Sequence, residues 1–327
     1  MQASASKDPL KGQHDTPADW TGPVKLAQLR EHVGVRLGLL VAPHDRAPVN
    51  LSRAVRHALL APGKRVRPLL AMLTAAEFGL DPLSALDAGC AVEFVHTASL
   101  VLDDLPCMDD ARTRRGVPAT HSVFGEATAM LAAIAMLSRA FGVLAQMEHV
   151  PAAARNELVA ILSRASGADG LAAGQERDLN ERSSSDCLAK IDAINDLKTG
   201  ALFIAACEMG GRIATVDAAT MNALSVMGRE IGLAFQTLDD LIDQVRSTGE
   251  AGKDTGKDAG KATIATVLGL EAARAEVARH TARALAAIEP FAAPGGPLSC
   301  FVAAMLNDAA AGAETRINEM TSGHHAK

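Results

Sequence analysis

Aromatic residues are scarce in this chain of 327 residues: they make up 3% of it, with no Tyr and a single Trp. Because β-strands favour aromatic and β-branched side chains, this scarcity argues against a β-sandwich or a β-barrel. Hydrophobic residues still reach 48%, and much of that share is Ala and Leu, which are strong helix formers. The composition therefore predicts an all-α protein with enough apolar material for a sizeable core.

A strong charge of one sign is also lacking, since 32 Lys and Arg stand against 38 Asp and Glu. Nucleic-acid binding needs a basic face for the phosphates, so we expect no nucleic-acid partner. The five cysteines are widely spaced without a CxxC motif, which favours a reducing compartment over disulfides or a zinc site. The N-terminus lacks the apolar core of a secretory signal, and no run of about 18 apolar residues is found. We therefore expect a cytoplasmic protein without a membrane span.

The chain is organised as one domain behind a short leader. Residues 1–24 are polar and rich in proline, which predicts a poorly ordered leader, and the domain covers 25–327. Within the domain, long apolar stretches alternate with polar breaks too short for an interdomain linker. Helices are expected over 83–102, 124–147, 221–245 and 264–288. The pattern predicts a single large bundle of long helices.

Two acidic clusters each follow an apolar run: DDLPCMDD at 103–110 and DDLID at 239–243. Asp239 and Asp243 are four residues apart and share one helix face, where like charges repel. Asp103 and Asp109 are six apart, and a helix that ends near Pro106 would let the chain turn and bring Asp109 back. Buried carboxylates need a cationic partner, and oxygen ligands alone select a hard ion such as Mg²⁺ or Ca²⁺.

Basic segments complement these clusters. They are GKRVRP at 63–68, RRG at 114–116, KTG at 198–200 and the lysines at 253 and 261. Arg binds diphosphate oxygens in a bidentate manner and Lys binds them as a point charge. Together the segments indicate Mg²⁺ that bridges acidic side chains to a diphosphate. The motifs of P-loop, zincin, α/β-hydrolase and Rossmann proteins are missing from the sequence.

In this order, the motifs over residues 25–310 resemble those of the trans-isoprenyl diphosphate synthases, or polyprenyl synthetases. The landmarks are GKRVRP, His96, DDLPCMDD, RRG, KTG, FQTLDDLID at 235–243 and the two lysines. The stretches 95–126 and 252–263 are most similar to bacterial geranylgeranyl diphosphate synthases of carotenoid pathways. The resemblance implies the isoprenoid synthase fold with a central apolar cavity, a homodimer and Mg²⁺. It also implies condensation of isopentenyl diphosphate with C5, C10 or C15 allylic diphosphates.

The resemblance implies a role for each matching residue. Mg²⁺ would be bound by Asp103, Asp104, Asp109 and Asp239, supported by Asp240 and Asp243. Isopentenyl diphosphate would be held by Lys64, Arg67, His96 and Arg115. The allylic diphosphate would be held by Arg114, Lys198, Lys253 and Lys261. The developing allylic cation would be faced by Thr199 and Gln236. Without the resemblance, His96 is more typical of a buried histidine with satisfied hydrogen bonds.

Product length is expected to depend on Ala98 and Ser99, about one helical turn before Asp103. Farnesyl synthases of the family usually have an aromatic residue at the fifth position before the motif, where this chain has Ala98. A small residue leaves the pocket open, so we expect growth past C15, stopped near C20 by bulkier residues such as Phe124 or Met130. The alternative is that Ala98 only permits a close helix contact.

Other functions compete with geranylgeranyl diphosphate synthesis. A farnesyl (C15) synthase differs only in product length. A class I terpene cyclase needs [ND]Dxx[ST]xxxE, which Asn195, Asp196 and Thr199 match in part, but Phe203 stands where Glu is required. A non-catalytic synthase-like subunit typically lacks one acidic motif, and both are intact here. A Ca²⁺-binding scaffold would need D-x-[DN]-x-[DN]-G loops, which are missing. Lys257 and the C-terminal MTSGHHAK receive no role.

Overall fold

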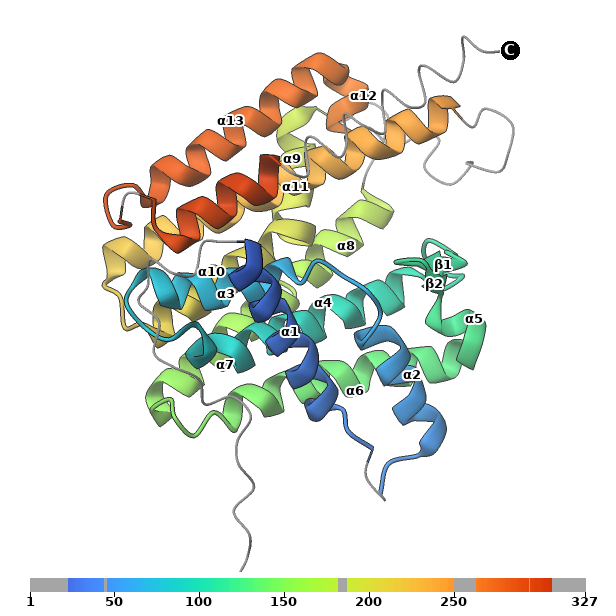
Figure 1. Ribbon diagram of the computed structural model, residues 1–327. Helices are drawn as coiled ribbons and strands as arrows, with labels where there is room; N and C mark the ends of the chain where they lie inside the picture. The colour runs from blue at the N-terminus through green and yellow to red at the C-terminus, as the bar shows by residue number, and fades with distance from the viewer. Residues whose placement is uncertain (1–22, 44–45, 182–186, 250–262, 294, 308–327) are drawn as a thin grey trace, which may run out of the picture.

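The structure, a computed structural model, describes residues 23–43, 46–181, 187–249, 263–293 and 295–307 (Figure 1). The helices of the first part are α1 (Pro23–Leu40), α2 (Val49–Leu59), α3 (Val66–Glu77), η2 (Pro82–Ala85), α4 (Leu86–Asp103), α5 (Thr120–Phe124) and α6 (Glu126–Ala145). They are followed by α7 (Ala152–Ser166), α8 (Leu171–Asn180), α9 (Leu188–Asn195), η3 (Asp196–Gly200), α10 (Ala201–Ile213), α11 (Ala218–Gly249), α12 (Ile264–Leu268) and α13 (Leu270–Ile288). A helix over Pro297–Asn307 comes last among the described residues.

The all-α prediction is confirmed. In the described residues, the only β-structure is a small hairpin of β1 (Thr113–Arg114) and β2 (Val117–Pro118), paired antiparallel. Helix α1 begins at Pro23 and so includes the last two residues of the expected leader, whose residues 1–22 lie outside the described part. The central apolar cavity that the resemblance implies stays a prediction.

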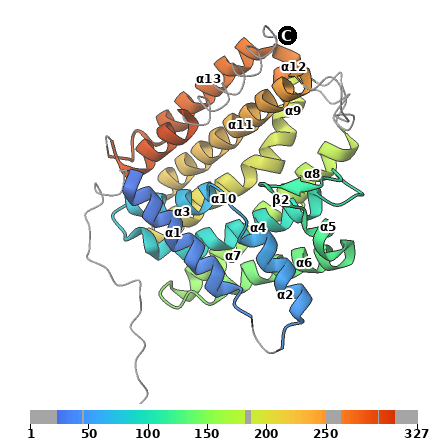
Figure 2. The ribbon, with the colours of Figure 1, turned by 45° about the vertical axis from the view of Figure 1, so that its right-hand side comes forward.

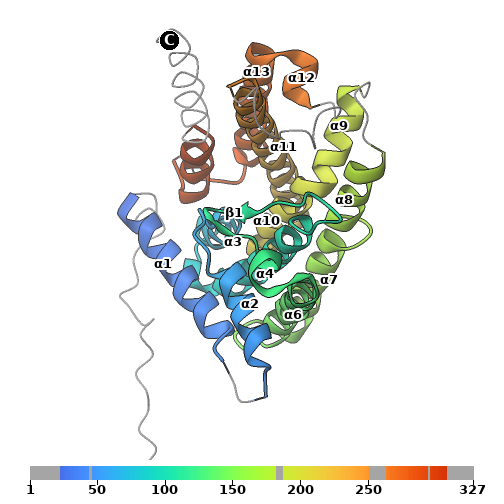
Figure 3. The same cartoon turned by 90° about the vertical axis from the view of Figure 1, so that its right-hand side faces the viewer.

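Helix α4 lies near the middle of the molecule, between α3 and α6, and also contacts α1, α2 and α10 (Figure 3). Its middle is buried around the whole circumference, as the full burial of the consecutive residues Cys90, Ala91 and Val92 illustrates. A helix that is apolar on all sides has to be covered on all sides, so the sequence itself places α4 in the core. The first acidic cluster follows at the end of this central helix.

Helix α11 is the longest described helix, and it packs beside α13 in both Figure 1 and Figure 2. It also contacts α10 and η3. The expected helix over 264–288 proves to be two helices, α12 and α13, because Gly269 has a φ of +81° and interrupts the helix between them. Gly125, with a φ of +83°, separates α5 from α6 in the same way within the expected helix 124–147.

The expectation that the chain has no membrane span stays a prediction, although two described helices are long and apolar enough for one. By length and composition, Pro82–Asp103 and Glu126–Ala145 could each cross a membrane. The first is 72% buried inside the protein, as expected for a core helix. The second, α6, is only 39% buried. Met130, Leu131 and Ile134 lie on its exposed face, at 43%, 55% and 61% exposure.

Helix α11 and the turn η3 approach each other closely because glycine lies on both sides of the contact. A Cβ built on Gly232 would lie only 2.6 Å from the Cα of Gly200. One turn earlier, a Cβ on Gly228 would lie 2.7 Å from the Cα of Ile204 in α10. Real Cβ atoms do not come this close to backbone atoms, so α11 packs backbone to backbone against η3 and α10.

We predict that Gly232→Ala forces η3 and α11 apart and destabilises the protein by about 2 kcal/mol through overpacking. The measurement is chemical denaturation followed by far-UV circular dichroism. The matched control is Gly34→Ala in α1, where nothing lies within 4 Å of the added Cβ. There the higher helix propensity of Ala should stabilise the protein by about 0.5–1 kcal/mol. Equal effects of the two substitutions would contradict the close approach.

Candidate active site

The first acidic cluster forms a compact turn where α4 ends. The N–H of Asp109 donates to the carbonyl of Asp103 at 2.9 Å, and the N–H of Ala111 donates to the carbonyl of Asp104 at 3.2 Å. The helix ends at Asp103, and the chain then folds back. The prediction that the turn near Pro106 returns Asp109 to Asp103 is confirmed.

Asp103 lies in an environment that disfavours its ionised form. Burial raises the pKa of its carboxyl to about 6, with a further contribution from Asp109. Lys198 and Arg114 act in the opposite direction but do not cancel the rise. A cation placed beside this carboxylate would relieve the repulsion. The end of α4 is thus suited to a divalent metal ion.

Asp104 faces the other way. It is 2% exposed, and its carboxylate accepts hydrogen bonds from Arg114, with Nε at 2.8 Å and Nη2 at 2.5 Å. The proximity of Asp104 raises the pKa of Arg114 despite its burial. This pair attaches the β1–β2 hairpin to α4. The expected metal ligand Asp104 is therefore bound to Arg114, which was expected on the allylic diphosphate.

In the second acidic cluster, too, one aspartate is exposed and the next one is buried and hydrogen-bonded within the protein. Asp239 is exposed and close enough to Arg67 to affect its pKa. Asp240 is 7% exposed, and its two oxygens accept from Gln236 Nε2 at 3.0 Å and from the backbone N–H of Ile264 at 3.3 Å. Asp240 thus connects α11 to the beginning of α12. The side chain of Asp243 lies outside the described part.

The KTG segment forms a π-helical turn, η3, between α9 and α10. Such turns break the regular helix register and are frequent at functional sites. Here the turn brings Thr199 to α11, where its hydroxyl donates to Gln236 Oε1 at 2.8 Å. It also directs Lys198 toward α8, where Nζ lies 2.6 Å from Asp178 Oδ2. Lys198 also influences the pKa of Asp103, so η3, which contacts α11, brings a positive charge near the acidic end of α4.

Three of the four predicted isopentenyl diphosphate residues, Arg67, His96 and Arg115, lie near a buried carboxylate, Glu93, on α4. Glu93 is 2% exposed and binds Arg65 at 2.6 Å and Arg115 at 3.6 Å. Arg115 Nη2 lies 3.0 Å from His96 Nε2, and because a guanidinium can only donate, the imidazole accepts. Glu93 was missed in the sequence, although its place three residues before His96 puts both on one helix face.

His96 is neutral in this arrangement. Burial lowers the pKa of its imidazole well below the ordinary value, and the positive charges of Arg67 and Arg115 lower it further. With Nε2 accepting from Arg115, the remaining ring proton is on Nδ1. Both readings of His96 are therefore partly met: its ring is hydrogen-bonded within the protein, and it lies among the predicted diphosphate-binding arginines.

Arg67 is held by an aromatic side chain. Its guanidinium carbon lies 4.3 Å from the centroid of the Phe203 ring, which in turn packs on Phe235 with 5.2 Å between centroids. Burial lowers the pKa of Arg67 to about 10, and its Nε has no hydrogen-bond partner among the described residues. A cation fixed in this way, with a donor to spare, is suited to bind an anion.

The remaining predicted residues lie in different surroundings. Lys64 is exposed, and its carbonyl accepts from Arg30 at 3.3 Å. Ala98 is fully buried in α4, and Ser99 donates to the carbonyl of His96 at 2.9 Å. The lysines at 253, 257 and 261 lie outside the described residues. Met130 was expected inside the pocket, and this is wrong for the single chain, because it lies on the outer face of α6.

No preformed metal centre is present in the described residues: no three His, Cys, Asp or Glu side chains converge to hold an ion by themselves. Mg²⁺ commonly binds through one or two carboxylates, with the remaining ligands supplied by substrate phosphates and water. The carboxylate oxygens of Asp103 and Asp109 therefore fit Mg²⁺ that binds together with a diphosphate.

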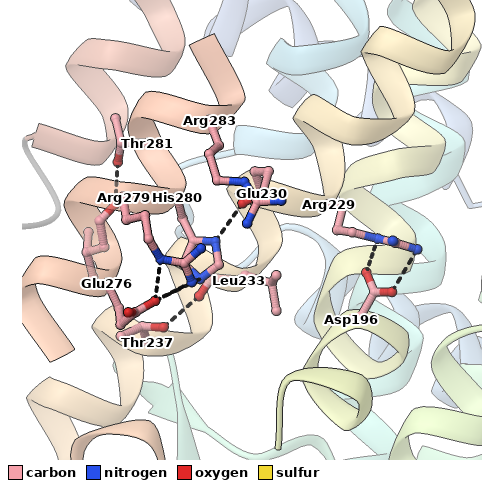
Figure 4. Close-up of polar contacts among 11 residues, drawn as sticks. Asp196, Arg229, Glu230, Leu233, Thr237, Glu276, Arg279, His280, Thr281 and Arg283 are labelled. Carbon is pink, nitrogen blue, oxygen red and sulfur yellow. Dashed lines mark hydrogen bonds and ion pairs between the residues drawn. The ribbon is translucent and has the colours of Figure 1, made fainter. Parts of the chain in front are cut away.

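Ion pairs fix α11, which bears the second cluster, on two sides (Figure 4). Arg229 binds Asp196 of η3 with contacts of 3.1 and 3.0 Å. The next residue, Glu230, is buried and binds His280 at 2.6 Å and Arg283 at 2.9 Å, both from α13. Adjacent side chains of α11 thus hold η3 and α13, two turns before Gln236.

Known proteins of one family are similar to this chain over most of its length. The sequence profile of the family described as polyprenyl synthetase matches residues 48–290. A geranylgeranyl diphosphate synthase of Pantoea ananas is 42% identical over 255 residues, which cover 77% of this chain and 83% of that protein. A farnesyl diphosphate synthase of Geobacillus stearothermophilus is 37% identical over 237 residues, covering 71% and 80%. The structure of an FPP/GFPP synthase from Zymomonas mobilis superimposes with a TM-score of 0.78 and 34% identity, covering 86% of this chain and 98% of that one.

The fold is therefore that of the isoprenoid synthases. The chain belongs to the polyprenyl synthetase family.

We predict that Glu230→Gln lowers the free energy of unfolding by about 3 kcal/mol, because it removes the buried carboxylate that binds both His280 and Arg283. Urea denaturation at pH 7 measures the change. The control is Glu271→Gln, which removes a surface pair with Arg274 at a residue whose side chain is 87% exposed. That change should cost less than about 0.5 kcal/mol. A loss for Glu230→Gln no larger than the control's would refute a stabilising role of the buried pair.

Proposed function

We propose that the protein is a Mg²⁺-dependent prenyltransferase that elongates C5, C10 and C15 allylic diphosphates with isopentenyl diphosphate and releases mainly geranylgeranyl diphosphate. The observation that carries the proposal is that Lys198 of η3 lies close enough to Asp103, at the end of α4, to affect its raised pKa, while η3 also contacts α11, which bears the second acidic cluster. The family membership and the 42% identity to geranylgeranyl diphosphate synthases support the same activity.

The first step is ionisation of the allylic diphosphate. Asp103, Asp109 and Asp239 would hold Mg²⁺, which when bound supplies Lewis-acid stabilisation of the departing diphosphate. Lys198 and, beyond the described part, Lys253 and Lys261 add positive charge around the same group. The C–O bond breaks with both electrons leaving on the diphosphate, and an allylic cation remains. Thr199 and Gln236, hydrogen-bonded to each other, offer that cation oxygen dipoles.

The second step joins the two substrates. Arg67 and Arg115 would bind the diphosphate of isopentenyl diphosphate, and Arg115 is oriented by Glu93 and the neutral His96. The alkene of isopentenyl diphosphate attacks the cation and forms a C–C bond. The new cation then loses a proton, for which the released diphosphate is the base. The product is again an allylic diphosphate, longer by five carbons, and can be ionised again.

Three further properties belong to the same proposal. We infer a homodimer that covers the exposed apolar face of α6, since an apolar patch of this kind is typical of a protein interface. Light scattering should give twice the 33.9 kDa of one chain, and a monomeric mass would contradict the dimer.

We also infer a cytoplasmic enzyme of carotenoid synthesis. The five free thiols support the location, which cell fractionation tests, and accumulation of carotenoid precursors on gene deletion tests the pathway.

The function is tested by incubating the full-length protein with Mg²⁺, labelled isopentenyl diphosphate and each allylic primer. We expect a C20 alcohol after dephosphorylation, and we expect Asp103→Asn to lose at least about a hundredfold of turnover with an unchanged far-UV spectrum. A C15 product would make the chain a farnesyl synthase. No elongation in the wild type would favour the non-catalytic subunit, and cyclic hydrocarbons would favour a cyclase.

Ala98→Phe is expected to shorten the main product toward C15, because an aromatic ring one turn before Asp103 would block a pocket that runs along α4. Chromatography of the released alcohols measures the length distribution. Ala91→Phe, two turns earlier in the same helix and equally buried, controls for general damage to the core. An unchanged product of Ala98→Phe would support the alternative that Ala98 permits a close helix contact only.

A further inference from the structure

The β1–β2 hairpin holds Arg115 in a strained backbone conformation. Two residues, Arg115 and Gly116, connect the strands, and both have a positive φ, of +53° and +79°. A two-residue turn of this kind suits Asn or Gly, whereas arginine is disfavoured in the left-handed region. Such strain persists only where the surrounding structure fixes the residue firmly. The contacts that hold the hairpin therefore decide where the Arg115 guanidinium lies.

On its inner side the hairpin is attached to α4. Arg114 of β1 binds Asp104. In the turn, the guanidinium of Arg115 contacts Glu93 at 3.6 Å and His96 at 3.0 Å. These contacts come from the first strand and the turn, and the second strand, β2, is held from another direction.

Strand β2 rests on α2 through His57. The Nε2 of His57 lies 2.8 Å from the carbonyl oxygen of Pro118. Because a carbonyl oxygen only accepts, Nε2 carries a proton and donates it. The His57 ring also packs edge to face with the Phe124 ring at the end of α5, with 5.5 Å between centroids. One half-buried side chain of α2 thus holds both ends of the segment 118–124.

Helix α2 also leads directly into residues 63–68, the other segment predicted to bind isopentenyl diphosphate. Arg65 donates to two carbonyls at the end of α2 and just after it, at 2.9 and 2.7 Å. A Cβ built on Gly63 would lie 3.2 Å from Nη1 of Arg115, so this segment touches the hairpin turn. The position of the hairpin on α2 therefore sets the spacing between residues 63–68 and Arg115.

We propose that His57 is a positioning residue for Arg115. By fixing β2 on α2, it holds the strained turn at the spacing at which Arg115 and the segment 63–68 meet one isopentenyl diphosphate molecule. The proposal rests on the function proposed above. His57 itself touches neither substrate and acts through the hairpin.

The rival explanation is that His57 only fills space between α2 and α5. The two explanations differ for His57→Phe, which keeps an aromatic ring beside Phe124 and removes the donor to Pro118. They also differ for His57→Gln, whose amide N–H reaches about as far as Nε2 and keeps the donor without the ring. Packing alone makes Gln the more harmful change, whereas positioning makes Phe the more harmful one.

The experiment measures steady-state kinetics and backbone hydrogen exchange of the full-length protein. For His57→Phe we expect the KM for isopentenyl diphosphate to rise about fivefold, as the loss of one hydrogen bond implies. The kcat and the KM for the allylic diphosphate should stay nearly unchanged. We also expect faster exchange of the backbone amides over 112–119. His57→Gln should remain close to the wild type in each quantity.

The matched control is His149→Phe. The Nε2 of His149, between α6 and α7, lies 2.9 Å from the carbonyl oxygen of Ser84 in η2. This substitution removes the same kind of hydrogen bond at a place that does not contact the hairpin. It should leave both KM values and the exchange over 112–119 at wild-type levels.

The proposal is overturned if His57→Phe keeps the wild-type KM and hairpin exchange, or if His57→Gln is impaired as much as His57→Phe. An equal rise of both KM values would also overturn it, because it would indicate general damage to the site. A wild type that does not elongate would refute the proposed function instead. The exchange over 112–119, which needs no ligand, would still decide whether His57 fixes the hairpin.

Discussion

The close approach of η3 to α11 is the constraint on which the arrangement of the site depends. A Cβ on Gly232 would lie 2.6 Å from the Cα of Gly200, so main-chain contact sets the distance between these segments. At that distance the Thr199 hydroxyl reaches Gln236, and Asp196 reaches Arg229. A wider separation would break both contacts, and it would also move Lys198 relative to the aspartates of α11. Small residues here are therefore a geometric requirement of the site.

The site gathers groups that are unfavourable when no ligand is bound. Asp103 is hard to ionise, Arg67 is desolvated, and His96 is kept neutral among arginines. Each of these costs would fall when a complementary charge arrives. Metal ions reduce the cost of Asp103, and diphosphates reduce the cost of the arginines. Because the two ligands also bind each other, each would improve the site for the other, so binding of metal and diphosphate should be cooperative.

The sequence was sufficient for the fold class and for most of the residues at the site, because long apolar helices and charged motifs leave strong local patterns. The turn that returns Asp109 to Asp103 could be anticipated from Pro106 alone. Contacts between distant segments could not be anticipated. In the sequence, Glu93 is a charge within an otherwise apolar helical stretch. Its partners Arg65 and Arg115 are distant in the sequence, and the fold brings them to it. The sequence did not predict the helix break at Gly269, because the spacing of apolar residues continues across it. The helical backbone conformation is interrupted there.

The resemblance implied that Asp103, Asp104 and Asp109 all bind Mg²⁺, and that Asp239 binds it with support from Asp240 and Asp243. The geometry argues that the two neighbouring aspartates of each cluster have different roles. Adjacent residues of a helix point about 100° apart, so two neighbouring aspartates cannot both face one ligand. In each cluster the second aspartate is turned into the protein: Asp104 binds Arg114 and holds the β1–β2 hairpin, and Asp240 binds Gln236 and the start of α12. The first, Asp103 or Asp239, remains on the side of the other charged groups of the site. In each pair of neighbouring aspartates, the first is therefore placed to bind a ligand. The second holds a neighbouring segment in position, and the side chains of that segment complete the site.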